Sequence, residues 1–264
     1  MQTPSIRTAL FDIQDGIDWV LGRRNPLVPP RKLIHGIGSS LDVGETYLRY
    51  FREFAELQSN ETVLDVGCGI GRMALPMTRY LRPPGWYEGF DIMRSNVTWC
   101  QRAITPRFPN FRFQHADVFN REYNPRGRLA GHEFRFPYPD GMFGFAYLTS
   151  VFTHLMPADA AHYLSEISRV LRPGGRCLAT FFLMNVESKS QLLAGRGSVS
   201  LQHFYGPAWV SNPEIPEACV ALDESFVAHA AEKAGLLIHR SYPGRWNGRE
   251  TFTDSQDILL FIKK

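Results

Sequence analysis

The sequence predicts an α/β fold with a mostly parallel sheet of seven strands, and three observations support this. Short apolar runs rich in β-branched and aromatic residues alternate with segments in which apolar residues recur at helical spacing. Strands that alternate with helices in this way form right-handed βαβ units, and these build a parallel sheet. The last two strands have no helix between them, so we expect them to pair antiparallel at one edge.

The expected elements follow one another in a regular order. A helix is expected over residues 41–57, where Val43, Tyr47 and Tyr50 recur at helical spacing. Another is expected over 157–171, because Pro157 is favoured at a first helical position and an apolar stripe follows it. The strands are expected at residues 62–67, 85–91, 111–117, 142–150, 176–183, 236–242 and 255–264, and the remaining helices at 70–81, 94–104 and 224–235.

Three segments fall outside this alternation. Residues 1–40 are expected to be irregular, with a proline-rich bend in RNPLVPPRK. The polar loop 118–141 has 24 residues, which is longer than a plain connection and typical of a functional loop. Residues 184–220, rich in Gly, Ser and aromatic residues, indicate an inserted cap. We therefore expect an N-terminal lid or helical segment at 1–57 and a main domain at 58–264 that carries the cap.

Composition excludes several classes of protein. The chain has 264 residues, of which 44% are hydrophobic and 21% charged, so it can bury a core and is not expected to be disordered. A net charge of +3 is too small to indicate nucleic-acid binding. The four cysteines form no C-x-x-C pair, which favours neither a zinc site nor a disulfide framework. No apolar run is long enough to span a membrane or act as a signal peptide, so a cytoplasmic location is expected.

The stretch VLDVGCGIGRMALP, residues 63–76, places Gly67, Gly69 and Gly71 directly after a buried strand. Glycine there lets backbone amides approach a ligand at the N-terminal end of the next helix. A dinucleotide or the amino-acid and ribose half of S-adenosylmethionine fits such a loop. The spacing lacks the third glycine of G-x-G-x-x-G. Asp65 before the glycines would repel a pyrophosphate but accept an ammonium group.

Two further acids stand at the ends of the next two strands. Asp91 ends the second strand, where a carboxylate can accept hydrogen bonds from ribose hydroxyls. Asp117 ends the third, where it can accept from an adenine amino group, and Val118 offers a backbone amide beside it. One acid at a strand end is commonly a turn residue or cap, but three acids at three successive strand ends favour a binding site.

The segments VLDVGCGIGR, GFDI, HADV and LTSVFTHL, followed by YLSEISRVLRPGG, resemble the class I S-adenosylmethionine-dependent methyltransferases, of the small-molecule type, over about residues 60–183. The resemblance implies a Rossmann-like, doubly wound fold with S-adenosyl-L-methionine as cofactor. By position it implies that the cofactor contacts are Asp65, Gly67 and Gly69 for the methionine moiety, Asp91 for the ribose, Ile92, Asp117 and Val118 for the adenine, and Leu148 or Thr149 for the methionine after strand four. Where many relatives have Phe-Asp at the start of strand four, this chain has Phe143-Gly144.

His154 is the strongest candidate for a catalytic base. It follows strand four in SVFTHL, in the loop expected over the reactive end of the cofactor. A hydroxyl acceptor needs a base to take its proton, whereas a neutral amine does not. The alternative is a structural histidine that caps the helix starting at Pro157.

The sequence therefore predicts methyl transfer by in-line displacement to the oxygen or nitrogen of a small-molecule acceptor. No metal ion, nucleic acid or membrane is expected to take part, because no acid cluster follows strand four and no strong basic patch or membrane-spanning run occurs. Two alternatives remain open: a non-catalytic scaffold that binds S-adenosylmethionine, and a nicotinamide-dependent oxidoreductase. Asp65 and the missing third glycine disfavour the oxidoreductase.

Overall fold

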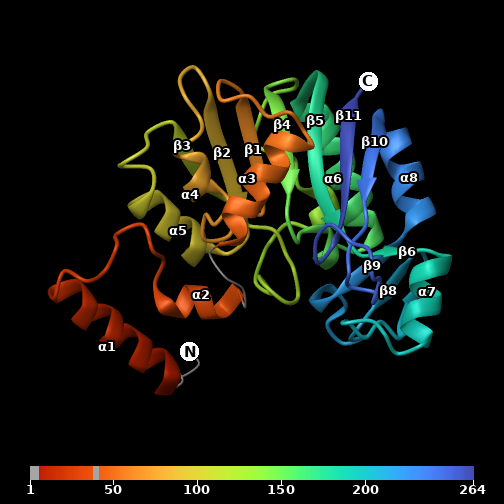
Figure 1. Cartoon of the computed structure of the whole chain (residues 1–264), viewed down its shortest axis with the longest axis horizontal. Coiled ribbons are helices and arrows are strands. Elements are labelled where there is room, and N and C mark those ends of the chain that lie inside the picture. Colours follow the sequence, from red (N-terminus) through yellow and green to blue (C-terminus); the bar gives the residue numbers. More distant parts are fainter. Residues whose placement is uncertain (1–5, 38–41) are drawn as a thin grey trace.

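Seven strands form the central sheet in the part of the chain that the computed structural model describes, residues 6–37 and 42–264. Their order is β10-β11-β5-β4-β1-β2-β3, and Figure 1 shows them side by side in the middle of the molecule. The strands are β1 (Thr62–Val66), β2 (Trp86–Asp91), β3 (Phe111–His115), β4 (Phe143–Leu148), β5 (Leu171–Phe181), β10 (Leu236–Tyr242) and β11 (Asp257–Lys263). All neighbours pair in parallel except β11, which runs antiparallel to β5 and β10. The predicted fold class is confirmed.

Helices cover both faces of the sheet. The helices on one face are α3 (Val43–Glu53), α4 (Ala74–Met77) and α5 (Arg94–Ala103), and those on the other are α6 (Pro157–Val170) and α8 (Glu224–Lys233). Strand β1 shows the alternation this requires, because Val63 packs with the first layer while Leu64 and Val66 pack with the second. Since both faces are covered, central strands are apolar along their whole length, and every residue of β4 is buried.

The helix expected over residues 70–81 is much shorter in the structure. Only Ala74–Met77 is α-helical, and turns surround it. Gly67, Gly69 and Gly71 have φ angles of +79°, +52° and +74°, a left-handed conformation that cannot continue into a helix. The same glycines that suit the loop to a ligand therefore delay the start of the helix.

The N-terminal segment contains two helices where the sequence predicted irregular structure. These are α1 (Ile6–Val20) and α2 (Arg31–Ile37); residues 1–5 and 38–40 of the predicted segment lie outside the described residues. The helices are joined by ion pairs, with Arg31 at 2.5 Å from Asp15 and 2.6 Å from Asp18. Leu10, Ile13 and Ile17 recur at helical spacing, so α1 has a local signal that the prediction of irregular structure overlooked. Among the described helices, none has the length and apolarity needed to cross a membrane.

The region predicted as a cap folds into a small second sheet beside the main one. Its strands lie in the order β6-β9-β8-β7, and Figure 1 shows them with α7 below the β10 edge. The elements are β6 (Leu183–Met184), α7 (Val186–Leu193), β7 (His203–Tyr205), β8 (Ala208–Val210), the short 3-10 helix η3 (Pro216–Ala218) and β9 (Val220–Asp223). Two further 3-10 helices, η1 (Gly131–Glu133) and η2 (Phe152–His154), flank β4 in the chain.

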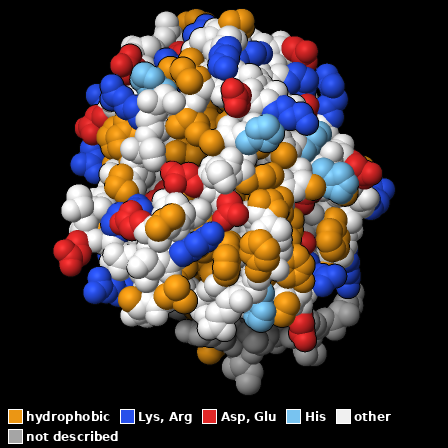
Figure 2. All heavy atoms as spheres, turned by 90° about the vertical axis from the view of Figure 1, so that its right-hand side faces the viewer, with side chains coloured by type: hydrophobic (Ala, Val, Ile, Leu, Met, Phe, Trp, Pro, Cys, Tyr) orange, Lys and Arg blue, Asp and Glu red, His pale blue; other side chains and the backbone are white. Residues whose placement is uncertain are grey.

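The face formed by this region and the neighbouring sheet edge has mixed chemistry. On the described part of it, Figure 2 shows basic and acidic side chains interspersed among hydrophobic ones rather than gathered by sign. The exposed apolar side chains of these elements include Val186, Leu193, Phe204, Tyr205 and Leu237. Such a surface does not have the concentrated positive charge that a nucleic-acid backbone requires.

Asp257 joins the cap to the main sheet. It is 3% exposed and lies at the start of β11. Its Oδ2 accepts hydrogen bonds from Leu183 N at 3.0 Å and from Trp246 Nε1 at 2.6 Å. Its Oδ1 accepts from Gly244 N at 2.8 Å and from Arg249 at 3.1 Å. The carboxylate therefore ties the first cap strand to the C-terminal hairpin.

Asp257→Ala should lower the free energy of unfolding by about 3–5 kcal/mol, because it leaves Arg249 and several buried N–H groups without their acceptor. Urea denaturation measures the change. Glu232→Ala, at an exposed position of α8, is the control and should stay within about 0.5 kcal/mol of wild type. Equal stability of the two variants would show that Asp257 is not an anchor.

Candidate active site

A cavity of about 540 Å³ opens at the carboxyl ends of β1, β2 and β4. This is the edge at which parallel α/β sheets bind ligands. The glycine loop and the end of β2 form one wall, and η2 forms another. Phe182, Val199 and Cys219 close a third side; Val199 and Cys219 lie in the predicted cap and Phe182 lies just before it. The cavity is large enough for a cofactor-sized ligand.

The glycine loop is shaped by backbone contacts. Gly67 N and Cys68 N both donate to Phe90 O, at 2.9 and 3.0 Å, which holds the loop against the end of β2. A Cβ on Gly67 would lie 2.4 Å from a Val151 methyl group, so a side chain is excluded there. A Cβ on Gly69 would meet nothing within 4 Å. Gly69 therefore presents bare backbone to the cavity.

Asp91 fixes the loop in this position. Its Oδ2 accepts a hydrogen bond from Gly69 N at 2.8 Å, and its Oδ1 accepts from Met93 N at 2.7 Å. Burial raises the pKa of this carboxyl, while the two N–H donors oppose the rise. Each oxygen keeps a lone pair, and Asp91 lines the cavity, so it can also accept hydrogen bonds from a ligand.

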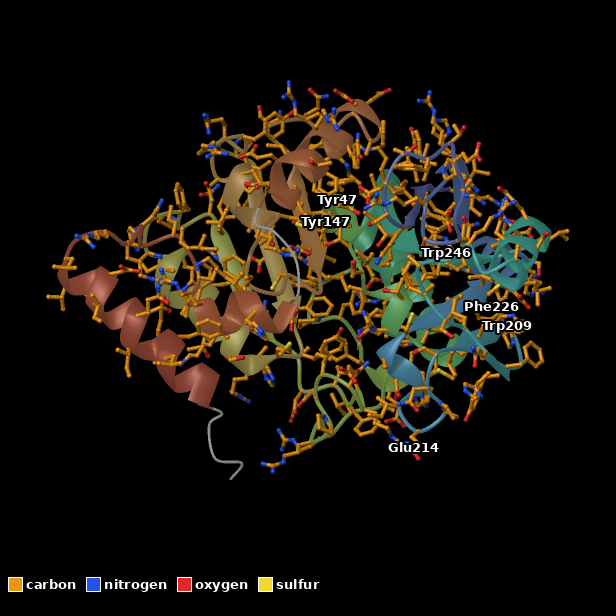
Figure 3. The ribbon with its side chains drawn as sticks, turned by 60° about the horizontal axis from the view of Figure 1, so that its bottom comes forward. Tyr47, Tyr147, Trp209, Glu214, Phe226 and Trp246 are labelled. Atoms are coloured by element: carbon orange, nitrogen blue, oxygen red, sulfur yellow. The ribbon has the colours of Figure 1, made fainter. Side chains whose placement is uncertain are left out.

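Asp65 lies away from the cavity. It is 2% exposed, and its Oδ2 accepts hydrogen bonds from Tyr87 Oη at 2.5 Å and Tyr147 Oη at 2.8 Å. Both tyrosines belong to the layer covered by α3, α4 and α5, and Figure 3 shows Tyr147 beside Tyr47 of α3 in that layer. Burial raises the pKa of Asp65 to about 7. The sequence predicted a contact between Asp65 and a ligand ammonium group. That contact would have to reach through the glycine loop.

The other predicted cofactor residues divide into two groups. Ile92, Val118 and Thr149 line the cavity together with Gly67, Gly69 and Asp91. Leu148 is fully buried in the sheet, and it is the next residue, Thr149, that reaches the cavity. Asp117 is not among the lining residues; it lines a smaller neighbouring pocket that shares Ile92 and Tyr123 with the cavity. It pairs with Arg128 at 2.5 Å, which lowers the pKa of its carboxyl.

His154 also lines the cavity, from the end of η2. Its Nδ1 lies 2.8 Å from Glu217 O, and its Nε2 lies 3.3 Å from Tyr123 Oη. A carbonyl oxygen only accepts, so Nδ1 carries the proton and Nε2 presents a lone pair in the neutral ring. Burial lowers the pKa of this imidazole. The ring is therefore neutral at neutral pH and able to accept a proton at Nε2.

Several cavity residues were not among the predicted cofactor-binding or catalytic residues. Arg72, directly after the third glycine, had a local signal in its position. Tyr123 lies in the long loop that was expected to be functional. Gln256 comes from the C-terminal hairpin, 165 residues after Asp91, and had no local signal. Thr153 Oγ1 and Gln256 Oε1 are buried without a hydrogen-bond partner among the described residues, so polar groups of a ligand can satisfy them.

The comparisons with known proteins agree with this geometry. A family model described as a methyltransferase domain matches residues 42–239, three quarters of the chain. The chain belongs to this methyltransferase family. The family resemblance seen in the sequence is thereby confirmed, and S-adenosylmethionine is the family's cofactor.

Two curated relatives match the chain over part of its length. The chain is 32% identical over 122 residues to phthiotriol/phenolphthiotriol dimycocerosates methyltransferase 1 of Mycobacterium ulcerans, a match covering 46% of this chain and 38% of the relative. It is 33% identical over 124 residues to fatty-acid O-methyltransferase of Mycolicibacterium smegmatis, a match covering 45% and 36%. The chain thus spans less than half the length of these relatives.

A solved structure supports the fold over almost the whole chain. A SAM-dependent methyltransferase from Aquifex aeolicus superposes with a TM-score of 0.53 at 17% sequence identity. The match covers 90% of this chain and 98% of that chain. At this identity the likeness establishes the Rossmann-like fold.

The residues present fit S-adenosylmethionine. Gly69 offers open backbone at the cavity wall, and Asp91 offers carboxylate lone pairs beside it. Ile92 and Val118 supply apolar surface on the same side, suited to an adenine ring. Among residues 6–37 and 42–264, no group of His, Cys, Asp or Glu side chains is arranged to hold a metal ion.

Asp91→Ala should weaken binding of S-adenosylhomocysteine by about 10- to 150-fold, because the ligand loses a charged acceptor and the glycine loop loses its support. Isothermal titration calorimetry measures the change. Asp117→Ala is the matched control, since that carboxylate pairs with Arg128 outside the cavity lining, and it should weaken binding less. A greater loss in the Asp117 variant would reverse the assignment.

The buried Asp65 makes stability depend on pH. Its folded pKa of about 7 exceeds the unfolded value of 3.8, so the folded protein holds a proton that the unfolded chain releases. The resulting stability is full below about pH 4 and is lost as the pH rises through about 7. Asp65→Asn should remove this slope, so wild type should lose about 2–3 kcal/mol relative to the variant between pH 5 and pH 8. Parallel slopes in urea denaturation would show that Asp65 does not titrate in this range.

Proposed function

We propose that the protein transfers the methyl group of S-adenosylmethionine to a hydroxyl group of a small, uncharged and largely apolar acceptor. The observation that carries this proposal is the imidazole of His154. Its Nδ1 proton is held by Glu217 O, which leaves Nε2 as the proton acceptor, 3.3 Å from Tyr123 Oη at the cavity wall. An oxygen acceptor needs such a base, whereas a neutral amine attacks without one.

The cavity walls indicate the class of acceptor. They include the apolar residues Val151, Leu155, Phe182 and Val199, with the hydroxyl groups of Tyr123 and Thr153 as polar points among them. Arg72, from the glycine loop, is the one Lys or Arg among the described lining residues, so an anionic acceptor finds no partner near His154. The names of the two relatives, a fatty-acid O-methyltransferase and a dimycocerosates methyltransferase, support an acceptor of apolar character.

Each residue has a distinct part in the proposed reaction. Bound S-adenosylmethionine would supply a methyl group attached to a sulfonium sulfur, and this sulfur is the leaving group that keeps the electron pair of the carbon–sulfur bond. Gly69 and Asp91 hold the cofactor, and Arg72 stands beside them for its carboxylate. His154 Nε2 receives the proton as the acceptor oxygen forms its bond to the methyl carbon. The walls exclude water, which would otherwise compete for the methyl group.

We also propose that the N-terminal segment 1–57 and the cap at 184–220 act as a lid on a methyltransferase domain at 58–264. Val199 and Cys219 bring the cap into the cavity wall. Within the N-terminal segment, α3 packs on the sheet through Phe51, whose ring centroid lies 4.4 Å from that of Tyr147. None of the described residues of the N-terminal segment, 6–37 and 42–57, lines the cavity, so its lid role is proposed from the sequence and the structure supports only the cap as a wall.

The test of this function is an acceptor screen. Hydroxyl-bearing and amine-bearing small molecules are incubated with the protein and S-adenosylmethionine, and mass spectrometry detects S-adenosylhomocysteine and the methylated product. Methylation of hydroxyl acceptors is expected. Methylation of amines alone would assign N-methylation, and cofactor binding without any product would assign the non-catalytic scaffold.

His154→Ala should lower kcat by about 10²- to 10⁴-fold, the usual contribution of a general base, and should leave cofactor affinity unchanged. His229→Ala, at an exposed position of α8, is the matched control and should keep wild-type kcat.

The wild-type rate should rise with pH through the pKa of His154, which burial places below the ordinary histidine range. The groups closest to the ring are Glu122, Tyr123 and the Glu217 carbonyl. The His154 variant should lose this limb of the profile. If the His154 variant is less stable but its folded molecules keep the wild-type kcat, His154 has a structural role.

A further inference from the structure

Tyr123 lines the cavity beside the proposed base. Its side chain is 38% exposed. Its ring meets the His154 ring edge to face, with centroids 4.9 Å apart and planes at 89°. Its Oη lies 3.3 Å from Nε2. Because Nδ1 holds the ring's single proton, this contact runs from the tyrosine hydroxyl, as donor, to Nε2 as acceptor.

The position of Tyr123 is built by the fold. Asn120 is 6% exposed, and its Oδ1 accepts hydrogen bonds from the backbone N of Glu122 and Tyr123, at 3.1 and 3.0 Å. The Nδ2 of the same residue donates to His154 O at 3.1 Å. One buried amide therefore holds the backbones of Tyr123 and His154 in a fixed relation.

We propose that Tyr123 is a second catalytic residue, which takes the proton of the acceptor hydroxyl while passing its own proton to His154 Nε2. This inference rests on the proposed function. Nε2 already accepts the hydrogen bond of the tyrosine hydroxyl, so an acceptor hydroxyl in the cavity can hydrogen-bond to the free lone pairs of Tyr123 Oη without breaking that contact.

The step is balanced. The carbon–sulfur bond of the cofactor breaks, and the acceptor oxygen forms a bond to the methyl carbon. The acceptor proton moves to Tyr123 Oη, the tyrosine proton moves to Nε2, and the product state holds a neutral tyrosine and an imidazolium. The imidazolium then releases one proton to solvent. Burial raises the pKa of Tyr123, so the hydroxyl stays protonated and acts only together with His154.

The first test needs no turnover. Nitrogen-15 NMR of the histidine rings is recorded on the full chain saturated with S-adenosylhomocysteine. His154 should carry its proton on Nδ1. Tyr123→Phe should raise the pKa of the His154 ring, because the neutral ring loses a hydrogen-bond donor. Tyr242→Phe is the matched control, since the Tyr242 hydroxyl is buried without a partner among the described residues and its ring stacks on Phe54 on the α3 side of the sheet. A proton on Nε2, or no change in Tyr123→Phe, would overturn the proposal.

The second test uses 4-nitrophenol as the acceptor probe, because its ionised form absorbs visible light. With S-adenosylhomocysteine bound, wild type and Tyr242→Phe should bind the probe as phenolate below its solution pKa. The absorption band of the bound phenolate should be absent in both Tyr123→Phe and His154→Asn. Asparagine is chosen for the second variant because its side-chain amide can still donate a hydrogen bond to Glu217 O. A phenolate band that persists in Tyr123→Phe would show direct proton transfer to His154. No bound probe in wild type would also overturn the proposal.

The two tests separate this inference from the proposed function. If the acceptor screen finds O-methylation but the NMR and the probe are indifferent to Tyr123, the function holds and the relay fails. A second outcome is that the cofactor binds and Tyr123→Phe changes the pKa of the His154 ring, but no acceptor is methylated. The contact between Tyr123 and His154 is then real, whereas the proposed function fails and the relay fails with it.

Discussion

The carboxylate of Asp91 is the interaction on which the site depends. It accepts the amide of Gly69 on one side and that of Met93 on the other, so the glycine loop after β1 and the turn after β2 are held as one unit. Glycines in left-handed conformations would otherwise leave the loop free to adopt many shapes. A buried charge is costly, but two backbone donors offset much of the cost. The same carboxylate thus shapes the loop and lines the cavity.

The second constraint is the joining of the cap to the sheet. Asp257 ties the first cap strand to the C-terminal hairpin, and Arg121 of the long loop donates to Glu214 O of the cap at 2.6 Å. Figure 3 shows Glu214 at the lower edge of the molecule, with Trp209 and Trp246 on the cap side. The cavity is therefore enclosed by segments far apart in the sequence. The chemistry of the cavity therefore depends on how these segments come together and not on any one segment.

The sequence predicted what depends on local pattern. Alternating periodicity indicated the sheet and its antiparallel edge, and the position of Gly69, Asp91 and Thr149 after strand ends placed them at the cavity. It could not show that Asp65 turns toward Tyr87 and Tyr147. Successive residues of a strand point to opposite faces of the sheet, and the geometry of the glycine loop decides which face a ligand contacts. Nor could the sequence find Gln256, whose place in the cavity depends on the hairpin that follows the cap. The ion pairs that join α1 to α2 leave no local pattern, but α1 itself has the helical spacing of Leu10, Ile13 and Ile17, which was overlooked.

The bond between His154 Nδ1 and Glu217 O has a consequence for timing. Glu217 belongs to the cap, so the ring is locked in its base-competent tautomer only while the cap lies against η2. In the lid motion that we propose for the cap, Nδ1 would lose its acceptor and the proton would be free to reside on either nitrogen. Closure of the site and organisation of the proposed base would then be one event, and an open site would hold the methyl donor without an organised base that could activate water against it.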